Sequence, residues 1–358
     1  MDRQIAVTNF NAGRFADTEQ FSRKLTAAYP NDGFGWKILG VSLFKLGRLH
    51  DALEPLKKAA LMMPQDWEAF GNLGAAYMAL GDLEHATACM VHALELNPRH
   101  IDSLSNMAEL CLNQGRRQEA LAYYQRKAEL LPEDGYTAHL VAMLSGAQTT
   151  QTPAGYITQL FDSYAQNFDT HLASKLKYEV PAQLAALVQG SAAPAAGSLD
   201  ILDLGCGTGL SGEPFVAMAR SLVGVDLSSG MLALAQKRGI YQRLLQTDVL
   251  SALKAEPDAS FDLILSADVY NYVGELDAVA AEVRRVLRPG GLHAFSIEES
   301  TGTSDRPVHL GTYGRYSHAP SYLKSLAEPL GFRILKDEAI TLRLEGDAPL
   351  AGRLQLWG

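Results

Sequence analysis

The chain has 358 residues, enough for two or three domains that each bury a hydrophobic core. Hydrophobic residues make up 47 % and charged residues 20 %, as in ordinary globular proteins, which excludes collagen-like and disordered classes. The net charge is −9 and lies mostly beyond residue 149, so we predict no nucleic-acid partner, which would need many basic contacts to phosphates. There is no run of about 18 apolar residues, no apolar signal segment and only three cysteines, so we expect a cytoplasmic protein without a membrane span, disulfide framework or metal site.

The first part of the sequence repeats with a fixed period from about residue 30 to residue 134. Three residue types recur in one register: Gly47, Gly81 and Gly115; Ala52, Ala86 and Ala120; Pro64, Pro98 and Pro132. Apolar residues at three- and four-residue steps predict two amphipathic helices in each unit. The glycines are expected to end the first helix of each unit and the prolines the second.

This pattern resembles the tetratricopeptide repeat family, which implies a solenoid of helical hairpins with a concave face. The full units are 33–66, 67–100 and 101–134, while residues 1–32 resemble a degenerate first unit and 135–146 a terminal helix. We place this domain at residues 1–148. Its surface either binds a protein or peptide or serves as a spacer or dimerisation element, and both readings, including a homo-oligomer, stay open.

A polar, proline-containing linker is predicted at 147–154, ahead of a second domain at 149–358. Helices are expected at 156–168 and 180–188, followed by a small-residue loop at 189–198. A buried-type strand, Leu199–Leu204, then turns through glycines into a helix expected at 213–220. A second strand ends in Asp226, where a carboxylate can hold the two hydroxyls of a ribose.

The later segments continue the alternation of strands and helices. We predict a strand at 260–269, a helix at 275–291 closed by Pro289 and two glycines, a strand at 292–299 and a final hairpin from 331–346 and 351–358. The fold class is therefore α followed by α/β, with a doubly wound, Rossmann-like, seven-stranded second domain. Its site should lie at the carboxyl ends of the first and fourth strands.

The sequences ILDLGCGTG (201–209) and VGVDLSSGMLALA (223–235) resemble the class I S-adenosylmethionine-dependent methyltransferases. The resemblance implies that Asp203 lies by the methionine ammonium, Asp226 binds the ribose and Asp248 accepts the adenine amino group. It implies further cofactor contacts from Gly205, Gly207, Gly209, Leu227, Met231 and Val249. The alternatives are a plain tight turn for the glycines and a helix N-cap for Asp248.

A second motif, LFDSYAQNFDTHL (160–172), resembles the helix that precedes the glycine loop in small-molecule methyltransferases. By that resemblance Tyr164 and Phe168 lie over the cofactor and exclude water. A helix that simply packs its apolar side into a core explains the spacing equally well. With the repeats included, the whole chain resembles a group of bacterial methyltransferases of unassigned substrate.

Candidate catalytic residues follow the fourth and fifth strands. We predict His318, in a loop at 311–320, as a general base, with Tyr270 and Glu298 as further catalytic candidates. A loop histidine that is merely solvated is the alternative. Arg306 and Arg315, beside Tyr316, are candidates to bind an acidic acceptor, since a carboxylate accepts a methyl group without a base.

The predicted function is methyl transfer from S-adenosylmethionine to a hydroxyl or carboxylate of a small molecule, with S-adenosylhomocysteine as the product. The alternatives are a protein or peptide methyltransferase whose repeats recruit the substrate, and a non-catalytic cofactor-binding adaptor.

Overall fold

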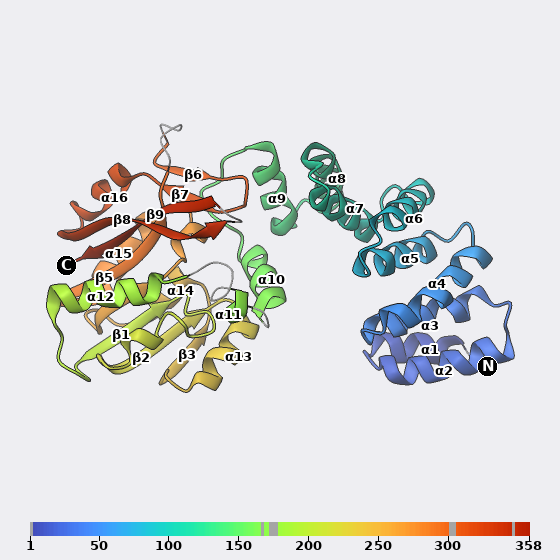
Figure 1. Cartoon of the computed structure of the whole chain (residues 1–358), viewed down its shortest axis with the longest axis horizontal. Helices are drawn as coiled ribbons and strands as arrows, with labels where there is room; N and C mark the ends of the chain where they lie inside the picture. The colour runs from blue at the N-terminus through green and yellow to red at the C-terminus, as the bar shows by residue number, and fades with distance from the viewer. Residues whose placement is uncertain (1–2, 166–167, 172–177, 301–305, 346–347) are drawn as a thin grey trace. The chain divides into compact units, whose positions relative to one another are not determined.

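The computed structural model describes residues 3–165, 168–171, 178–300, 306–345 and 348–358 (Figure 1). It divides into two compact units, Met1–Leu144 and Ser145–Gly358. The division falls four residues before the predicted boundary between 148 and 149. Of the helices in the described ranges, none is long and apolar enough to cross a membrane.

The first unit consists of paired helices, as the repeat pattern predicts. The helices are α1 (Arg3–Asn11), α2 (Phe15–Ala28), α3 (Gly33–Lys45), α4 (Leu49–Met62), α5 (Trp67–Ala79), α6 (Leu83–Leu96), α7 (Ile101–Asn113), α8 (Arg117–Leu130) and α9 (Gly135–Ser145). Gly47, Gly81 and Gly115 lie between paired helices and have φ of 75°, 80° and 73°. Because L side chains disfavour this conformation, glycine is the residue that ends the first helix of each pair.

Glycine also permits the helices of one pair to approach closely. A Cβ atom at Gly40 of α3 would lie 2.6 Å from Cγ of Leu56 in α4. Leu56 and Ala52 are fully buried between these helices. A residue without a side chain at Gly40 is therefore a packing requirement of this hairpin.

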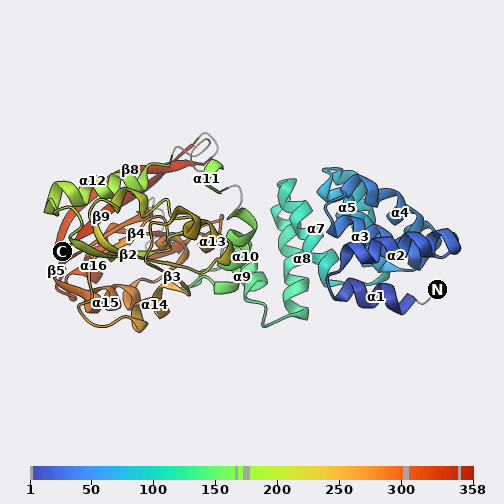
Figure 2. The same cartoon turned by 90° about the horizontal axis from the view of Figure 1, so that it is seen from below.

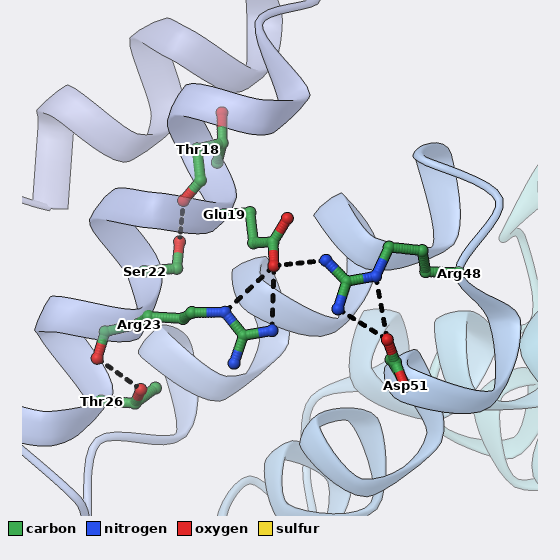
Figure 3. A network of polar contacts seen from close by, with 7 residues as sticks. All are labelled: Thr18, Glu19, Ser22, Arg23, Thr26, Arg48 and Asp51. Atoms are coloured by element: carbon green, nitrogen blue, oxygen red, sulfur yellow. Dashed lines mark hydrogen bonds and ion pairs between the residues drawn. The ribbon is translucent and has the colours of Figure 1, made fainter.

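Charged side chains join α2 to α4 at the start of the unit (Figure 3). Glu19 of α2 accepts hydrogen bonds from Arg23, at 2.9 and 3.0 Å, and from Arg48, at 2.7 Å. Arg48 precedes α4 and also pairs with Asp51 at 2.6 Å. These groups are partly exposed, so we expect them to orient the first helix pairs and to contribute little to stability.

The second unit is built on a seven-stranded sheet among its described residues, in the order β3-β2-β1-β4-β5-β9-β8 (Figure 1). Its strands are β1 (Leu199–Leu204), β2 (Ala219–Asp226), β3 (Arg243–Gln246), β4 (Phe261–Ser266), β5 (Leu287–Glu298), β8 (Ile334–Glu345) and β9 (Ala348–Trp357). Neighbours among β1 to β5 run parallel, whereas β9 is antiparallel to both β5 and β8. The predicted fold class and closing hairpin are confirmed.

Helices cover both faces of this sheet, and each face has its own core (Figure 2). One face packs against α12 (Val180–Ala192), with Leu184 and Val188 fully buried. The other packs against α14 (Val249–Ala255), α15 (Asp277–Val286) and α16 (Pro320–Ala327). Because both faces are covered, β1 and β4 are each apolar at four of six positions and are mostly buried.

Two predicted helices are shorter than expected because residues at their C-terminal ends pair with strands of the sheet. The helix expected at 213–220 is only the 3₁₀ turn η3 (Glu213–Phe215), since Ala219 already pairs with Leu199. The helix expected at 275–291 ends at Val286, because Leu287 pairs with Phe261 and the following Pro-Gly-Gly segment lies in an irregular part of β5.

Two predicted loops also contain regular structure. The loop expected at 311–320 belongs to a small hairpin of β6 (Val308–Leu310) and β7 (Tyr316–His318). The loop expected at 189–198 begins later, because α12 continues to Ala192 and ends where Ala193 adopts φ of 40°. The strand predicted at 260–269 is β4, which already ends at Ser266. The chain then forms the 3₁₀ turn η4 (Tyr270–Tyr272).

Candidate functional site

A cavity of about 910 Å³ opens at the carboxyl ends of the parallel strands, within the second unit. The ends of β1, β2 and β3 form one part of its wall; we call this part the cofactor end. The cofactor end includes Gly205, Cys206, Gly207, Asp226, Leu227, Met231, Thr247, Asp248 and Val249. The part beyond β4 is the acceptor end, and it includes Gln151, Thr152, Tyr156, Asp268, Tyr272, Tyr313, Arg315 and Arg343.

The glycine loop after β1 turns where the strand order of the sheet reverses, as predicted. Gly207 has φ of 53°, and a Cβ atom there would meet nothing closer than Phe168, 3.9 Å away across the cavity. A Cβ atom at Gly205 would lie 2.3 Å from Val269, so this glycine brings the loop against the segment after β4. The loop therefore leaves open backbone at the cofactor end.

Gly209 belongs to the turn but not to the cavity wall. Its φ is 95°, and a Cβ atom would lie 2.8 Å from the side chain of Arg238 and 3.2 Å from Tyr241. The cavity-lining residues pass from Thr208 to Leu210 and omit it. Gly209 therefore has a packing role in the turn, and its predicted cofactor contact stays a prediction.

Asp226 joins the glycine loop to the helix that follows β2. Its carboxylate accepts hydrogen bonds from the backbone N–H of Gly207, at 2.9 Å, and of Ser228, at 2.8 Å. Burial raises the pKa of this carboxyl, against the effect of the backbone donors. Asp226 also lines the cavity, where its remaining lone pairs suit the predicted ribose hydroxyls.

Asp203 lies behind the glycine loop rather than in the cavity wall. One carboxylate oxygen accepts hydrogen bonds from the hydroxyls of Ser211 and Tyr241, both at 2.7 Å. The other, Oδ1, is buried and has no hydrogen-bond partner among the described residues. Burial raises the pKa of Asp203 to about 6. Such an orphaned oxygen fits the vicinity of a cationic ammonium, although direct contact stays a prediction.

Asp248 has the N-cap role that its sequence position left open, and its contact with adenine stays a prediction. It caps α14 by accepting a hydrogen bond from Ser251 N at 2.9 Å, and it also lines the cavity. Burial opposes ionisation, but the hydrogen bonds from Ser251 lower the pKa of this carboxyl. The cap fixes the carboxylate beside Val249, and Leu227 and Met231 line the same end.

The motif at 160–172 forms α10 (Ala154–Tyr164) and α11 (Phe168–His171), while residues 166, 167 and 172 lie outside the described ranges. Tyr164 and Phe168 both line the cavity, with ring centroids 5.3 Å apart. Phe161 packs on Tyr272 at 5.2 Å and links this aromatic group to the acceptor end. Tyr164 and Phe168 thus line the same cavity as the cofactor-end residues, and their position over the cofactor stays a prediction.

The two aspartates of this motif tie its helices to opposite sides of the cofactor end. Asp162 accepts hydrogen bonds from Ser228 Oγ, at 2.5 Å, and Gly230 N, at 3.1 Å, at the start of α13 (Ser229–Arg238). Asp169 accepts from Thr208 Oγ1 in the glycine loop and pairs with Arg238. Sequence reasoning missed these roles, although the Phe-Asp dipeptide recurs seven residues apart.

Because these ties close the cofactor end, we expect Asp162→Asn and Asp169→Asn to release S-adenosylhomocysteine about three- to tenfold faster than the unmodified chain. The rate is measured by displacement of labelled S-adenosylhomocysteine. Glu213→Gln is the matched control, since Glu213 also pairs with Arg238, at 3.2 Å, but does not hold α11. An unchanged release rate in both asparagine variants would contradict a closing role.

The structure places His318 away from the cavity. It is fully buried in β7, and its Nε2 lies 2.7 Å from the carbonyl oxygen of Gly274, to which it donates. Burial lowers the pKa of His318 to about 4, so the ring is neutral near neutral pH. A buried ring that holds a backbone carbonyl is not placed to take a proton from an acceptor, and the predicted base role is corrected.

Tyr270 and Glu298 also have packing partners instead of a free path to the cavity. Tyr270 is buried, and its hydroxyl lies 2.8 Å from Nε2 of His293. Glu298 accepts a hydrogen bond from Arg315 Nε at 2.9 Å and lies 3.5 Å from Arg343. Neither lines the cavity, so both are corrected from catalytic to supporting positions.

Arg343 of β8 is the main residue of the acceptor end that the sequence did not reveal. It is buried, pairs with Asp268 and lines the cavity beside Arg315. Asp268 itself has φ of 60°, a conformation that is costly for a non-glycine residue and often occurs at functional sites. The only sequence signal was a single arginine between the apolar residues Leu342 and Leu344. Arg306, by contrast, is exposed and outside the cavity wall.

The predicted linker is part of this unit; we call residues 148–153 the strap. The Gln148 side chain accepts from Leu310 N at 2.8 Å and donates to Leu310 O at 3.3 Å. Thr149 Oγ1 lies 2.6 Å from the Tyr316 hydroxyl, and Thr150 O accepts from Glu275 N at 2.9 Å. The strap then lines the acceptor end from residue 151 onward.

Comparisons with known proteins agree with this division. A methyltransferase domain model matches residues 202–295, and tetratricopeptide repeat models match 67–100 and 103–135. The chain is similar to malonyl-[acyl-carrier protein] O-methyltransferase of Serratia marcescens, with 32 % identity over 140 residues, 39 % of this chain and 51 % of that protein. It is also similar to ubiquinone biosynthesis O-methyltransferase of Bradyrhizobium sp. (strain ORS 278), with 32 % identity over 99 residues, 27 % of this chain and 39 % of that protein.

Among solved structures, the chain resembles Burkholderia thailandensis 1,6-didemethyltoxoflavin-N1-methyltransferase, determined with S-adenosylhomocysteine. The identity is 19 %, the TM-score is 0.45, and the match covers 57 % of this chain and 87 % of that chain. The chain spans about half or less of the length of the two curated relatives.

Proposed function

The chain carries N-terminal tetratricopeptide repeats followed by a class I S-adenosylmethionine-dependent methyltransferase domain, and we propose that it methylates an oxygen atom of a small-molecule acceptor, a hydroxyl or a carboxylate. The observation that carries this proposal is one continuous cavity with two chemically different ends. The cofactor end matches the glycine loop and carboxylates of the family, and the acceptor end offers tyrosines and arginines. Both curated relatives described above are O-methyltransferases. A cytoplasmic location is a separate part of the proposal.

The residues of the cofactor end fit the methyl donor. Open backbone at Gly207 and the carboxylate of Asp226 suit its methionine and ribose parts. The orphaned Oδ1 of Asp203, outside the cavity wall, suits the vicinity of its ammonium. S-adenosylmethionine supplies an electrophilic methyl group when bound. The protein is left to align the acceptor and exclude water, which contributes several kcal/mol in favourable cases.

Aromatic residues of α10 and α11 help to exclude water from the site. Phe161, Tyr164 and Phe168 form edge-to-face contacts along the cavity, and Asp162 and Asp169 anchor their helices. Water that reached the site would weaken the electrostatic contacts of the polar groups in it. We therefore assign α10 and α11 to closing the site around both substrates.

A protein or peptide acceptor is the second candidate, and the repeat matches favour it. Tetratricopeptide surfaces present a concave face made of successive helices, which suits an extended partner. In this reading the repeats bring the substrate to the methyltransferase unit. A non-catalytic adaptor that only binds the cofactor is the third reading.

One assay separates these readings. The full chain is incubated with labelled S-adenosylmethionine and a cell extract split into metabolite and protein fractions, beside a chain that begins at Ser145 and keeps the strap. We expect S-adenosylhomocysteine above the blank with the metabolite fraction for both chains, because the second unit has its own cores. Turnover that needs the protein fraction and the repeats would support the peptide reading. Cofactor binding with no turnover in either fraction would support the adaptor.

A further inference from the structure

Two guanidinium groups meet at the acceptor end. Arg315 donates to Oε2 of Glu298 at 2.9 Å, and Arg343 lies 3.5 Å from the same oxygen. Arg343 is held from its other side by Asp268. One carboxylate oxygen thus fixes two arginines from different segments, β8 and the β6–β7 turn, side by side in the cavity wall.

Both guanidinium groups stay charged in this partly buried setting. Burial opposes the charge of Arg343, and so does the nearby charge of Arg315, but Asp268 and Glu298 raise the pKa of Arg343 above its ordinary value. The two arginines also repel each other, and Glu298 already offsets part of this repulsion from one side. A second anion that reached both guanidinium groups from the cavity would offset more of it.

Tyrosine hydroxyls add further donors around the pair. Burial raises the pKa of Tyr272 to about 12, so its hydroxyl is protonated. The positive charges of Arg315 and Arg343 are close enough to act in the opposite direction on this pKa. Burial likewise raises the pKa of Tyr156, against the charge of Arg315. Tyr313 lies under the Arg315 guanidinium at 5.8 Å. A donor set of arginines and phenols matches a carboxylate.

This group of donors lies next to the cofactor end. Val269, which follows Asp268, is packed against Gly205 of the glycine loop so closely that a Cβ atom there would be 2.3 Å from it. Arg343 pairs with Asp268, the residue before Val269. A group bound at Arg343 is therefore close to the glycine loop, which is assigned to the methyl donor.

We propose that the acceptor is a carboxylic acid, bound as its carboxylate by Arg315 and Arg343 and methylated on that group. This inference rests on the proposed function and selects the carboxylate over the hydroxyl. A carboxylate oxygen forms the new bond to the methyl carbon while the carbon–sulfur bond of S-adenosylmethionine breaks and leaves its electron pair on sulfur. The products are a methyl ester and S-adenosylhomocysteine, and no proton is released. Glu298 and Asp268 are positioning residues for the two arginines.

The test titrates hexanoate, octanoate, benzoate and phenylacetate, with the primary amide of each, into the full chain saturated with S-adenosylhomocysteine. We expect calorimetry to show binding of at least one acid, with its amide about tenfold weaker or more. With methyl-labelled S-adenosylmethionine, the bound acid should yield a product that releases labelled methanol in alkali. Equal binding of acid and amide, no binding in either series, or an alkali-stable product would overturn the proposal.

Variants assign the effect to the arginine pair. Arg315→Gln should weaken the acid about tenfold or more and leave the affinity for S-adenosylhomocysteine unchanged. Arg306→Gln, at an exposed arginine outside the cavity wall, should change neither. Arg343→Lys keeps the charge beside Asp268 and should weaken the acid without loss of the fold. If S-adenosylhomocysteine fails to bind the unmodified chain, the proposed function falls rather than this inference alone.

Discussion

Asp226→Ala is expected to abolish measurable binding of S-adenosylhomocysteine. The carboxylate is predicted to accept two hydrogen bonds from the ribose, and a hydrogen bond to a charged group contributes about 1.5–3 kcal/mol. The same oxygens hold Gly207 N and Ser228 N, so alanine also leaves two backbone donors of the glycine loop and α13 without their acceptor. Together these losses predict an affinity at least roughly a hundredfold lower, measured by calorimetry.

A second variant at the same position keeps one of the two loop contacts, because Gly207 N and Ser228 N bond to different oxygens of Asp226. Asp226→Asn retains one carbonyl oxygen but replaces the other acceptor by a donor, so we expect an intermediate affinity. Asp258→Ala, at an exposed aspartate that pairs with Arg285 away from the cavity, should bind like the unmodified chain. An Asp226→Ala chain that melts normally and binds with unchanged affinity would refute the cofactor assignment.

The cofactor end was predictable because its chemistry follows from local sequence. Backbone geometry requires glycine at positions such as Gly207, where φ is positive and a ligand must come close, and Asp226 follows directly from the end of a buried strand. The repeats were predictable for a similar reason, since the glycine that ends each first helix recurs in every unit.

At the acceptor end the sequence pointed to Arg315 but not to Arg343, because this end is assembled from segments far apart in the sequence. The pairing of β8 with β9, of β9 with β5 and of β5 with β4 brings Arg343 to Asp268, and Glu298 at the end of β5 joins Arg343 to Arg315 of the β6–β7 turn. No local pattern encodes such a meeting. Residue type alone favoured His318 as a base, whereas its burial in the β6–β7 hairpin gives it the carbonyl of Gly274 as a partner.

The buried His318 helps to form the surface on which the strap lies. It donates to the carbonyl of Gly274, and Thr150 O packs on the other side of the same residue. The strap therefore depends on this glycine as well as on the side-chain contacts of Gln148 and Thr149. The segment predicted as a linker between domains instead lines the acceptor end from residue 151 onward, which is why the shortened chain must begin before it.

Gly274→Ala should displace the strap, since a Cβ atom there would lie 2.1 Å from Thr150 O, a distance that no packing change of a side chain relieves. The substitution also strains the backbone, where φ is 82°, by about 1–2 kcal/mol. We expect faster amide hydrogen exchange over residues 145–156, and weaker binding of any acid that binds the unmodified chain. S-adenosylhomocysteine affinity should change little, because its residues lie at the other end of the cavity.

Gly290→Ala separates the displacement from the strain. Gly290 has φ of 79°, and a Cβ atom there meets nothing within 4 Å, so this variant adds the backbone strain without a clash. If both variants lose the same stability and neither raises exchange in the strap, the strap is not a wall of the acceptor end. If only Gly274→Ala opens the strap and weakens acid binding, the segment that follows the repeats in the chain also completes the acceptor site.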